Sequence, residues 1–153
     1  MNQQRRDILR ISTVLGLAFS AGILKPGEVF AGEWNAQVFD AKTLQDALKA
    51  LGADKFGSSD DIAINAPDIA ENGAVVPVAM TSKIANTEYM AILVEKNPNA
   101  MAAGFTLPAG TEPFVSTRVK MGGTSKVYAL VKAGGKWYAA DKEIKVTLGG
   151  CGG

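Results

Sequence analysis

The chain has 153 residues, of which 47% are hydrophobic and 20% are charged, and its formal net charge is +1. This length is typical of one globular domain, and the near-neutral charge argues against a surface that binds nucleic acid or an anionic membrane. Histidine is absent and cysteine occurs once. The commonest general base and metal ligand are therefore missing, and zinc, haem and iron–sulfur sites have no ligand set. The composition predicts a small domain without a cofactor.

Residues 1–31 are predicted to be an export signal that is removed. Arg5 and Arg6 open a short basic region, and residues 11–24 form an apolar run of about 14 residues, shorter than the ~20 that span a bilayer. The paired arginines resemble, imperfectly, a signal for the twin-arginine route. Cleavage before Gly32 predicts a mature protein in a bacterial periplasm, free of the membrane. A retained membrane anchor is the alternative interpretation.

A single helix is predicted over residues 40–51. Leucine and alanine side chains recur there at helical spacing, with polar residues between them. Asp40 is expected to cap the start of the helix, and Gly52 is expected to end it. Its apolar face is expected to pack against a sheet, and a partner's groove is the less favoured alternative. Residues 54–61 are predicted to form a loop.

From residue 62 onward, the sequence has the pattern of short strands joined by turns. Gly134-Gly135 is a typical two-residue hairpin turn. Pro77 lacks an N–H, which favours an edge or bulged strand. The fold class predicted for residues 32–148 is mainly β, an antiparallel immunoglobulin-like β-sandwich with one N-terminal helix. Trp34, Trp137 and Tyr138 are expected to be core or interface aromatics. The predicted strands are 62–65, 74–80, 89–94, 105–107, 114–121, 126–132, 136–140 and 143–148.

The last five residues, here called the tail, place the only cysteine among glycines: Gly149, Gly150, Cys151, Gly152 and Gly153. Glycine visits both signs of φ, so these residues are predicted to form a flexible, swinging arm. The alternation of Ile144, Val146 and Leu148 predicts a final strand anchored in the sandwich. At ~3.3–3.6 Å per residue, the arm could carry the Cys151 thiol roughly 10 Å beyond Leu148.

An odd cysteine in an exported protein indicates either intermolecular pairing or a free reactive thiol. The nearest basic residue to Cys151 in the sequence is Lys145, and no histidine is present to activate the thiol. The chain therefore offers a thiol but has little with which to perform catalysis on it. We expect other proteins to supply the chemistry, with an incidental or dimer-forming cysteine as the alternative.

The tail and the strand 143–148 before it, together with residues 69–78, 95–98 and 117–121, resemble the SoxY family over essentially the whole chain. This family is the sulfur-carrier subunit of the periplasmic thiosulfate-oxidation (Sox) system. The resemblance implies a carrier rather than an enzyme, with sulfur intermediates bound covalently to the cysteine that matches Cys151. It implies SoxZ as the heterodimer partner. It also implies three enzymes: the c-type cytochrome SoxAX, which attaches thiosulfate; the dimanganese hydrolase SoxB, which releases sulfate; and the sulfane dehydrogenase SoxCD.

Two other functions stay open on the residues alone. One is a thiol redox enzyme or sulfurtransferase with Cys151 as its nucleophile, although a base and a resolving cysteine are missing. The other is a structural or adhesion-type sandwich that dimerises through Cys151. For the surface that meets SoxZ, the hypothesis is the apolar strand 89–94, placed at a sheet edge.

Overall fold

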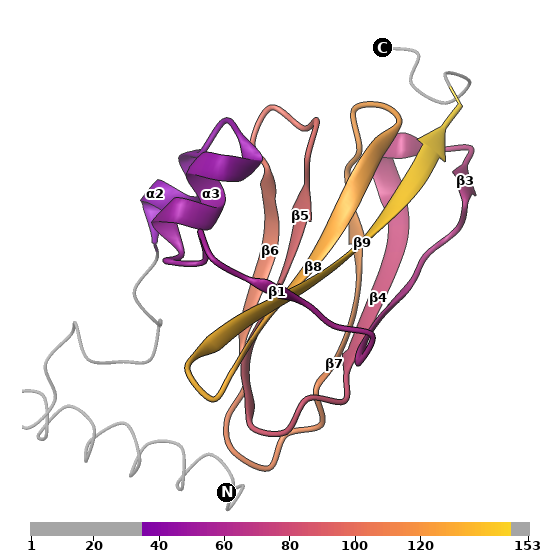
Figure 1. Cartoon of the computed structure of the whole chain (residues 1–153). Coiled ribbons are helices and arrows are strands. Elements are labelled where there is room, and N and C mark those ends of the chain that lie inside the picture. The colour runs from indigo at the N-terminus through magenta and orange to yellow at the C-terminus, as the bar shows by residue number, and fades with distance from the viewer. Residues whose placement is uncertain (1–34, 148–153) are drawn as a thin grey trace, which may run out of the picture. The chain divides into compact units, whose positions relative to one another are not determined.

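The computed structural model describes residues 35–147 (Figure 1). The predicted export signal, Trp34, Leu148 and the tail lie outside the described residues. Residues 35–147 contain two α-helices and one 3₁₀ turn: α2 (Ala36–Asp40), α3 (Leu44–Ala50) and η1 (Gly73–Val75). The strands are β1 (Gly57–Ser58), β2 (Ile62–Asn65), β3 (Ile69–Ala70), β4 (Val76–Ser82), β5 (Thr87–Val94), β6 (Met101–Thr106), β7 (Phe114–Val119), β8 (Ser125–Ala133) and β9 (Lys136–Val146).

The strands form two sheets, which confirms the predicted β-sandwich. The larger sheet has the order β1-β9-β8-β5-β6, with β3 also paired to β9, and the smaller has the order β2-β4-β7. The long strands pair antiparallel, as predicted. The short strands β1 and β3 differ, because both pair with β9 in parallel. Figure 1 shows β3 beside the end of β9.

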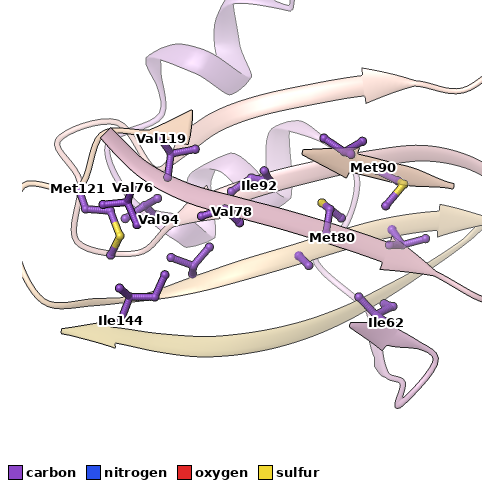
Figure 2. Close-up of a cluster of buried hydrophobic side chains, with 14 of the residues drawn as sticks. Ile62, Val76, Val78, Met80, Met90, Ile92, Val94, Val119, Met121 and Ile144 are labelled. Atoms are coloured by element: carbon purple, nitrogen blue, oxygen red, sulfur yellow. The ribbon is translucent and has the colours of Figure 1, made fainter. Parts of the chain in front are cut away.

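Two hydrophobic clusters explain the layers. One fills the space between the sheets and includes Met80, Ile92 and Ile144 (Figure 2). The other joins the opposite face of the larger sheet to the helices and includes Leu48 and Leu93. The larger sheet is thus covered on both faces, so its central strands are apolar at consecutive positions.

Strand β5 is central, and the hypothesis that residues 89–94 form an exposed edge is wrong. It pairs with β8 on one side and with β6 on the other. Residues 90–94 are all 0% exposed, because alternate side chains enter the two clusters. An apolar run of this kind marks a strand buried on both faces, and the pairing with β6 and β8 leaves β5 without a free edge.

Strand β4 is central in its sheet, but Pro77 still occupies a local edge. The pairing with β2 begins at Ala79, whereas the pairing with β7 already includes Pro77. Pro77 therefore has a neighbouring strand on one side only, which suits a residue that lacks an N–H. The prediction of an edge position is therefore confirmed for Pro77, but it is wrong for strand β4 as a whole.

The single predicted helix over 40–51 is two helices. Asn35 caps α2, which ends where the prediction began, and Thr43 caps α3 by accepting a hydrogen bond from the Asp46 amide at 3.1 Å. Asp40 is therefore not the N-cap. The C-terminal end of α3 agrees with prediction: Gly52 has φ +69° and its amide bonds to the Lys49 carbonyl at 3.0 Å.

Strand β9 is one continuous strand where two were predicted. It forms a hairpin with β8 through Gly134 and Gly135, whose positive φ values of 55° and 74° confirm the predicted turn. Trp137 packs against the helix-facing cluster and Tyr138 against the cluster between the sheets. Both aromatics therefore contribute to the core, as expected.

Candidate functional site

Strand β9 ends at Val146, one residue before the end of the described chain. Residues 144–147 are called the base of the tail. Ile144 is 0% exposed and belongs to the cluster between the sheets, and Val146 packs against the same cluster. Lys145 and Thr147 are exposed. This alternation confirms the predicted anchor as far as Val146. The candidate site is therefore the set of contacts that hold residues 144–147.

Hydrogen bonds hold this end of β9 from both sides. On one side, the Lys145 amide donates to the Asp68 carbonyl at 2.9 Å and the Thr147 amide donates to the Ala70 carbonyl at 3.1 Å. On the other side, the Val146 amide donates to Thr124 Oγ1 at 3.0 Å. Backbone groups of successive strand residues point to alternate sides, so each amide finds its own partner. Hydrogen bonds therefore hold the base of the tail as far as Thr147, the last described residue.

Gly73 fits tightly against the same base. A Cβ at this position would lie 2.5 Å from the Met121 carbonyl oxygen and 2.9 Å from Val146 Cγ1. The Met121 amide also donates to the Gly73 carbonyl at 2.7 Å. Only a residue without a side chain permits this approach, because the nearest obstacle is backbone.

We predict that Gly73→Ala destabilises the fold by about 1–3 kcal/mol, the usual cost of overpacking. The loss is expected near the end of β9, with faster hydrogen exchange at the Val146 and Thr147 amides than in the wild type. Urea unfolding and amide exchange measure the two effects. The matched control is Gly123→Ala, since a Cβ there meets nothing within 4 Å. Equal stability of the two variants would contradict the packing argument.

Lys142 ties the segment before β3 to β9. Its Nζ lies 2.9 Å from Asp68 Oδ1 and donates to the Ala66 carbonyl at 2.5 Å. The hydrogen bond and charge of Lys142 hold the pKa of the Asp68 carboxyl below its ordinary value of 3.8. Because folding lowers this pKa, the ionised Asp68 stabilises the folded protein. This contribution is fully present above pH 3.8, and it is lost as the pH falls through the lower pKa that Asp68 has in the folded protein.

Lys142→Met is expected to return the pKa of Asp68 towards 3.8, because the substitution removes both the hydrogen bond and the positive charge of Lys142. Carboxyl-carbon NMR titration of the folded protein measures this directly. An Asp68 pKa that is the same in variant and wild type would show that Lys142 does not act on it.

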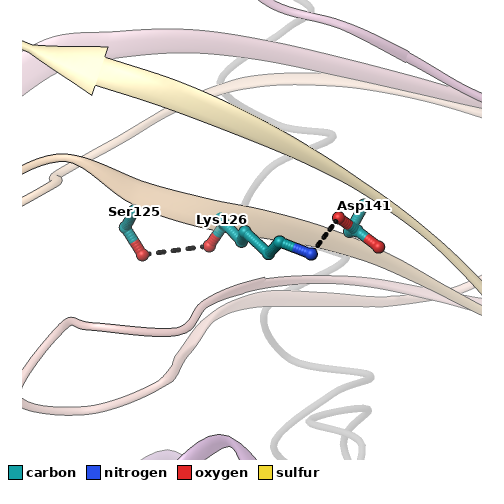
Figure 3. Close-up of polar contacts among 3 residues, drawn as sticks. All are labelled: Ser125, Lys126 and Asp141. Carbon is teal, nitrogen blue, oxygen red and sulfur yellow. Dashed lines mark hydrogen bonds and ion pairs between the residues drawn. The ribbon is translucent and has the colours of Figure 1, made fainter.

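Strand β8 supports the base of the tail from within the larger sheet. Ser125, which is 2% exposed, lies opposite Ile144, and its hydroxyl accepts from the Lys96 amide and donates to the Lys126 carbonyl, each at 3.0 Å. Lys126 Nζ in turn lies 2.9 Å from Asp141 Oδ2 of β9 (Figure 3). Asp141 raises the pKa of Lys126, mainly through this hydrogen bond. The Lys126–Asp141 ion pair joins β8 to β9, and the Ser125 hydroxyl joins β8 to the turn after β5.

The predicted site residues themselves, Cys151 and the four glycines of the tail, lie outside the described residues. The sequence pattern did not indicate the residues that hold the base of the tail, notably Asp68, Gly73 and Thr124. Asn72-Gly73 is a typical turn dipeptide, and Asn72 caps η1 by accepting from the Ala74 amide at 2.9 Å. Nothing in the sequence indicated that the turn contacts β9.

The part of the chain that the structure describes offers little other chemistry. Within residues 35–147, no three or more acidic side chains gather in a way that could hold a metal ion. No helix in that range has the length and apolar character that crossing a bilayer requires. The base of the tail is the feature to which the sequence and the packing both point.

Comparison with known proteins identifies the family. The family model described as "Sulfur oxidation protein SoxY" matches residues 47–151, a range that includes Cys151. No curated protein matches the chain significantly. Among solved structures, the sulfur carrier protein SoxY from Chlorobium limicola f thiosulfatophilum is 37% identical with a TM-score of 0.64, over 74% of this chain and 100% of that one.

A second solved structure shares the fold alone. It is a superoxide reductase (neelaredoxin) from Ignicoccus hospitalis, which is 19% identical with a TM-score of 0.50, over 69% of this chain and 93% of that one. At this identity, the similarity says nothing about chemistry. The match of the family model over most of the chain, with the 37% identity to a solved member, shows that this chain belongs to the SoxY family of sulfur oxidation proteins.

Proposed function

We propose that this protein is a covalent carrier of sulfur intermediates in thiosulfate oxidation, with the Cys151 thiol as the point of attachment. As a SoxY-family member it is a substrate carrier and not an enzyme. The related structure from Chlorobium is named a sulfur carrier protein. In the proposed division of labour, Cys151 holds the substrate, the glycines of the tail let it enter partner active sites, and residues 32–148 form the body.

The proposed chemistry has two steps at the Cys151 sulfur. First, the thiol and thiosulfate join by a new sulfur–sulfur bond, which releases one proton and passes two electrons to the partner cytochrome. Second, water cleaves the terminal sulfur–sulfur bond of this thiosulfonate, which releases sulfate and leaves a persulfide on Cys151. The carrier supplies only the thiol, which agrees with a sequence that contains no histidine.

The observation that carries the proposal is the contrast at residue 147. Residues 144–147 are held by hydrogen bonds on both sides and by a buried Ile144, and four of the next six residues are glycine around the only cysteine. A firmly held base before a glycine-rich tail suits a thiol that must travel while its carrier stays docked. The family match, which extends to residue 151, supports the same interpretation.

The partners and location follow from the same proposal. SoxZ is the proposed heterodimer partner, SoxAX attaches thiosulfate, SoxB hydrolyses the adduct, and SoxCD oxidises the sulfur that stays on the carrier. The haem and manganese belong to those partners. Export by the twin-arginine route and removal of residues 1–31 would place the carrier in the periplasm, where these enzymes act.

Intact-mass spectrometry tests the proposal. Incubation of the SoxYZ complex with thiosulfate and SoxAX is expected to add one thiosulfate unit to this chain, removable by a reductant and absent from Cys151→Ser. Turnover of thiosulfate by the isolated chain would favour a sulfurtransferase instead. A mass corresponding only to a disulfide-linked dimer, whatever the substrate, would favour the structural alternative.

A further inference from the structure

We propose that Ile69 and Val75 form a docking patch for the enzymes that act on Cys151. This pair is called the base patch below. The inference rests on the proposed carrier function and adds the surface through which the enzyme binds the carrier. The base patch is proposed to contact the enzyme around the entrance to its active site, into which the tail inserts.

The tail has a short reach. Cys151 follows Thr147 by four residues, so at ~3.3–3.6 Å per residue its Cα lies at most about 14 Å from that of Thr147. An enzyme that takes the Cys151 sulfur into a recessed active site uses much of this length inside the recess. The rim of that recess must then contact the residues around Thr147.

Two exposed apolar side chains lie near the base of the tail. Within residues 35–147, the exposed large hydrophobics are Phe56, Ile69, Val75 and Phe114. Ile69 is 58% exposed and pairs with Lys145 at the end of β9. Val75 is 51% exposed and lies two residues after Gly73, which packs against Val146. Half of these side chains therefore flank the base of the tail.

The fold itself does not require these two side chains. The neighbouring residues Ala70 and Val76 are 5% and 0% exposed and make the core contacts of β3 and β4. Contiguous exposed apolar patches mark interaction sites, and the buried centre of an interface is more apolar than its rim. The base patch thus suits contact with an apolar surface that forms only when an enzyme docks.

The charges around the base patch are mixed and favour apolar over electrostatic recognition. Glu71 and Lys145 are both exposed and have opposite signs, and Asp68 is paired with Lys142. No single sign dominates, so electrostatic steering should be weak. Docking is therefore expected to depend little on salt concentration.

The test uses the SoxYZ complex carrying a thiosulfonate on Cys151, loaded chemically with tetrathionate. The thiolate attacks an inner sulfur of tetrathionate and releases thiosulfate, so no docking enzyme is needed for loading. The substrate is then offered to SoxB. For the double variant Ile69→Ser/Val75→Ser, we expect KM to rise about tenfold with kcat within about twofold of the wild type. The variant binds SoxB more weakly, whereas the hydrolysis of the bound adduct is unchanged.

The matched control is Phe114→Ser. Phe114 is 50% exposed, but it pairs with Thr81, whereas the other end of β7 pairs Val119 with Val76 near the base patch. It therefore lies at the far end of the smaller sheet, and its replacement should leave KM unchanged. Thermal unfolding of all variants checks that the exposed substitutions leave the fold intact.

Three outcomes would overturn the inference. An unchanged KM in the double variant would remove the base patch from docking while leaving the carrier function standing. Loss of SoxZ from the double variant would assign the base patch to the subunit interface. A wild-type adduct that SoxB does not process would overturn the carrier function, and the docking inference with it.

Discussion

Cys151→Ser is expected to lower sulfate formation from thiosulfate by the reconstituted Sox enzymes to the rate measured without this chain. The chain contains one cysteine, so the substitution removes its entire capacity to form a sulfur–sulfur bond. A serine hydroxyl is a much weaker nucleophile than a thiol near neutral pH, because a few per cent of a free thiol is present as the thiolate. Sulfate release over time measures the effect.

A thiol placed elsewhere provides the control for this experiment. Thr111 is exposed and lies in the loop before β7, so Thr111→Cys in the Cys151→Ser background restores a thiol away from the tail. We expect no recovery of sulfate formation. Recovery would show that any accessible thiol suffices and that the glycine-flanked position of Cys151 has no special role.

Ile144→Ala is expected to lower the free energy of unfolding by about 2–5 kcal/mol. Ile144 is 0% exposed and is the last fully buried residue of β9, so the truncation leaves a cavity between the sheets. Urea denaturation with an unchanged m-value measures the loss. The same variant should weaken the anchor of the tail, because the end of β9 then keeps its hydrogen bonds and the partial packing of Val146 but has no fully buried side chain.

Lys145→Ala is the neighbouring control. Lys145 is exposed, and its backbone amide keeps its bond to the Asp68 carbonyl in the variant, so stability should change by no more than about 0.5 kcal/mol. If Ile144→Ala cost as little as Lys145→Ala, the end of β9 would not be anchored in the core, and the proposed firm base would be wrong.

The layered fold could be predicted from the sequence where periodicity was decisive. Gly134-Gly135 predicted the hairpin. The alternation of Ile144, Val146 and Leu148 predicted the anchored strand, which is confirmed as far as Val146. The helix prediction failed in detail because apolar spacing continues through residues 40–51, whereas Ala41 is extended and its carbonyl accepts from the Ala100 amide at 3.2 Å. A tertiary hydrogen bond thus breaks a locally plausible helix.

The surroundings of the site could not be predicted in the same way. Strand β3 has only two residues, and they pair with residues of β9 that lie 76 positions later in the sequence. Gly73 looked like an ordinary turn glycine, and its need to be glycine comes from Met121 and Val146, which approach it only in the fold. The strand 89–94 was misplaced because continuous apolarity does not say how many neighbours a strand has.

The most direct test of the carrier function is mass spectrometry of the tail itself from cells oxidising thiosulfate. Cleavage after Lys145 yields the peptide 146–153, which contains the only cysteine of the chain. We predict that this peptide carries a thiosulfonate or a persulfide on Cys151, and that both disappear after reduction. A peptide found only as the free thiol or as a disulfide with a second copy of the chain would contradict the proposal.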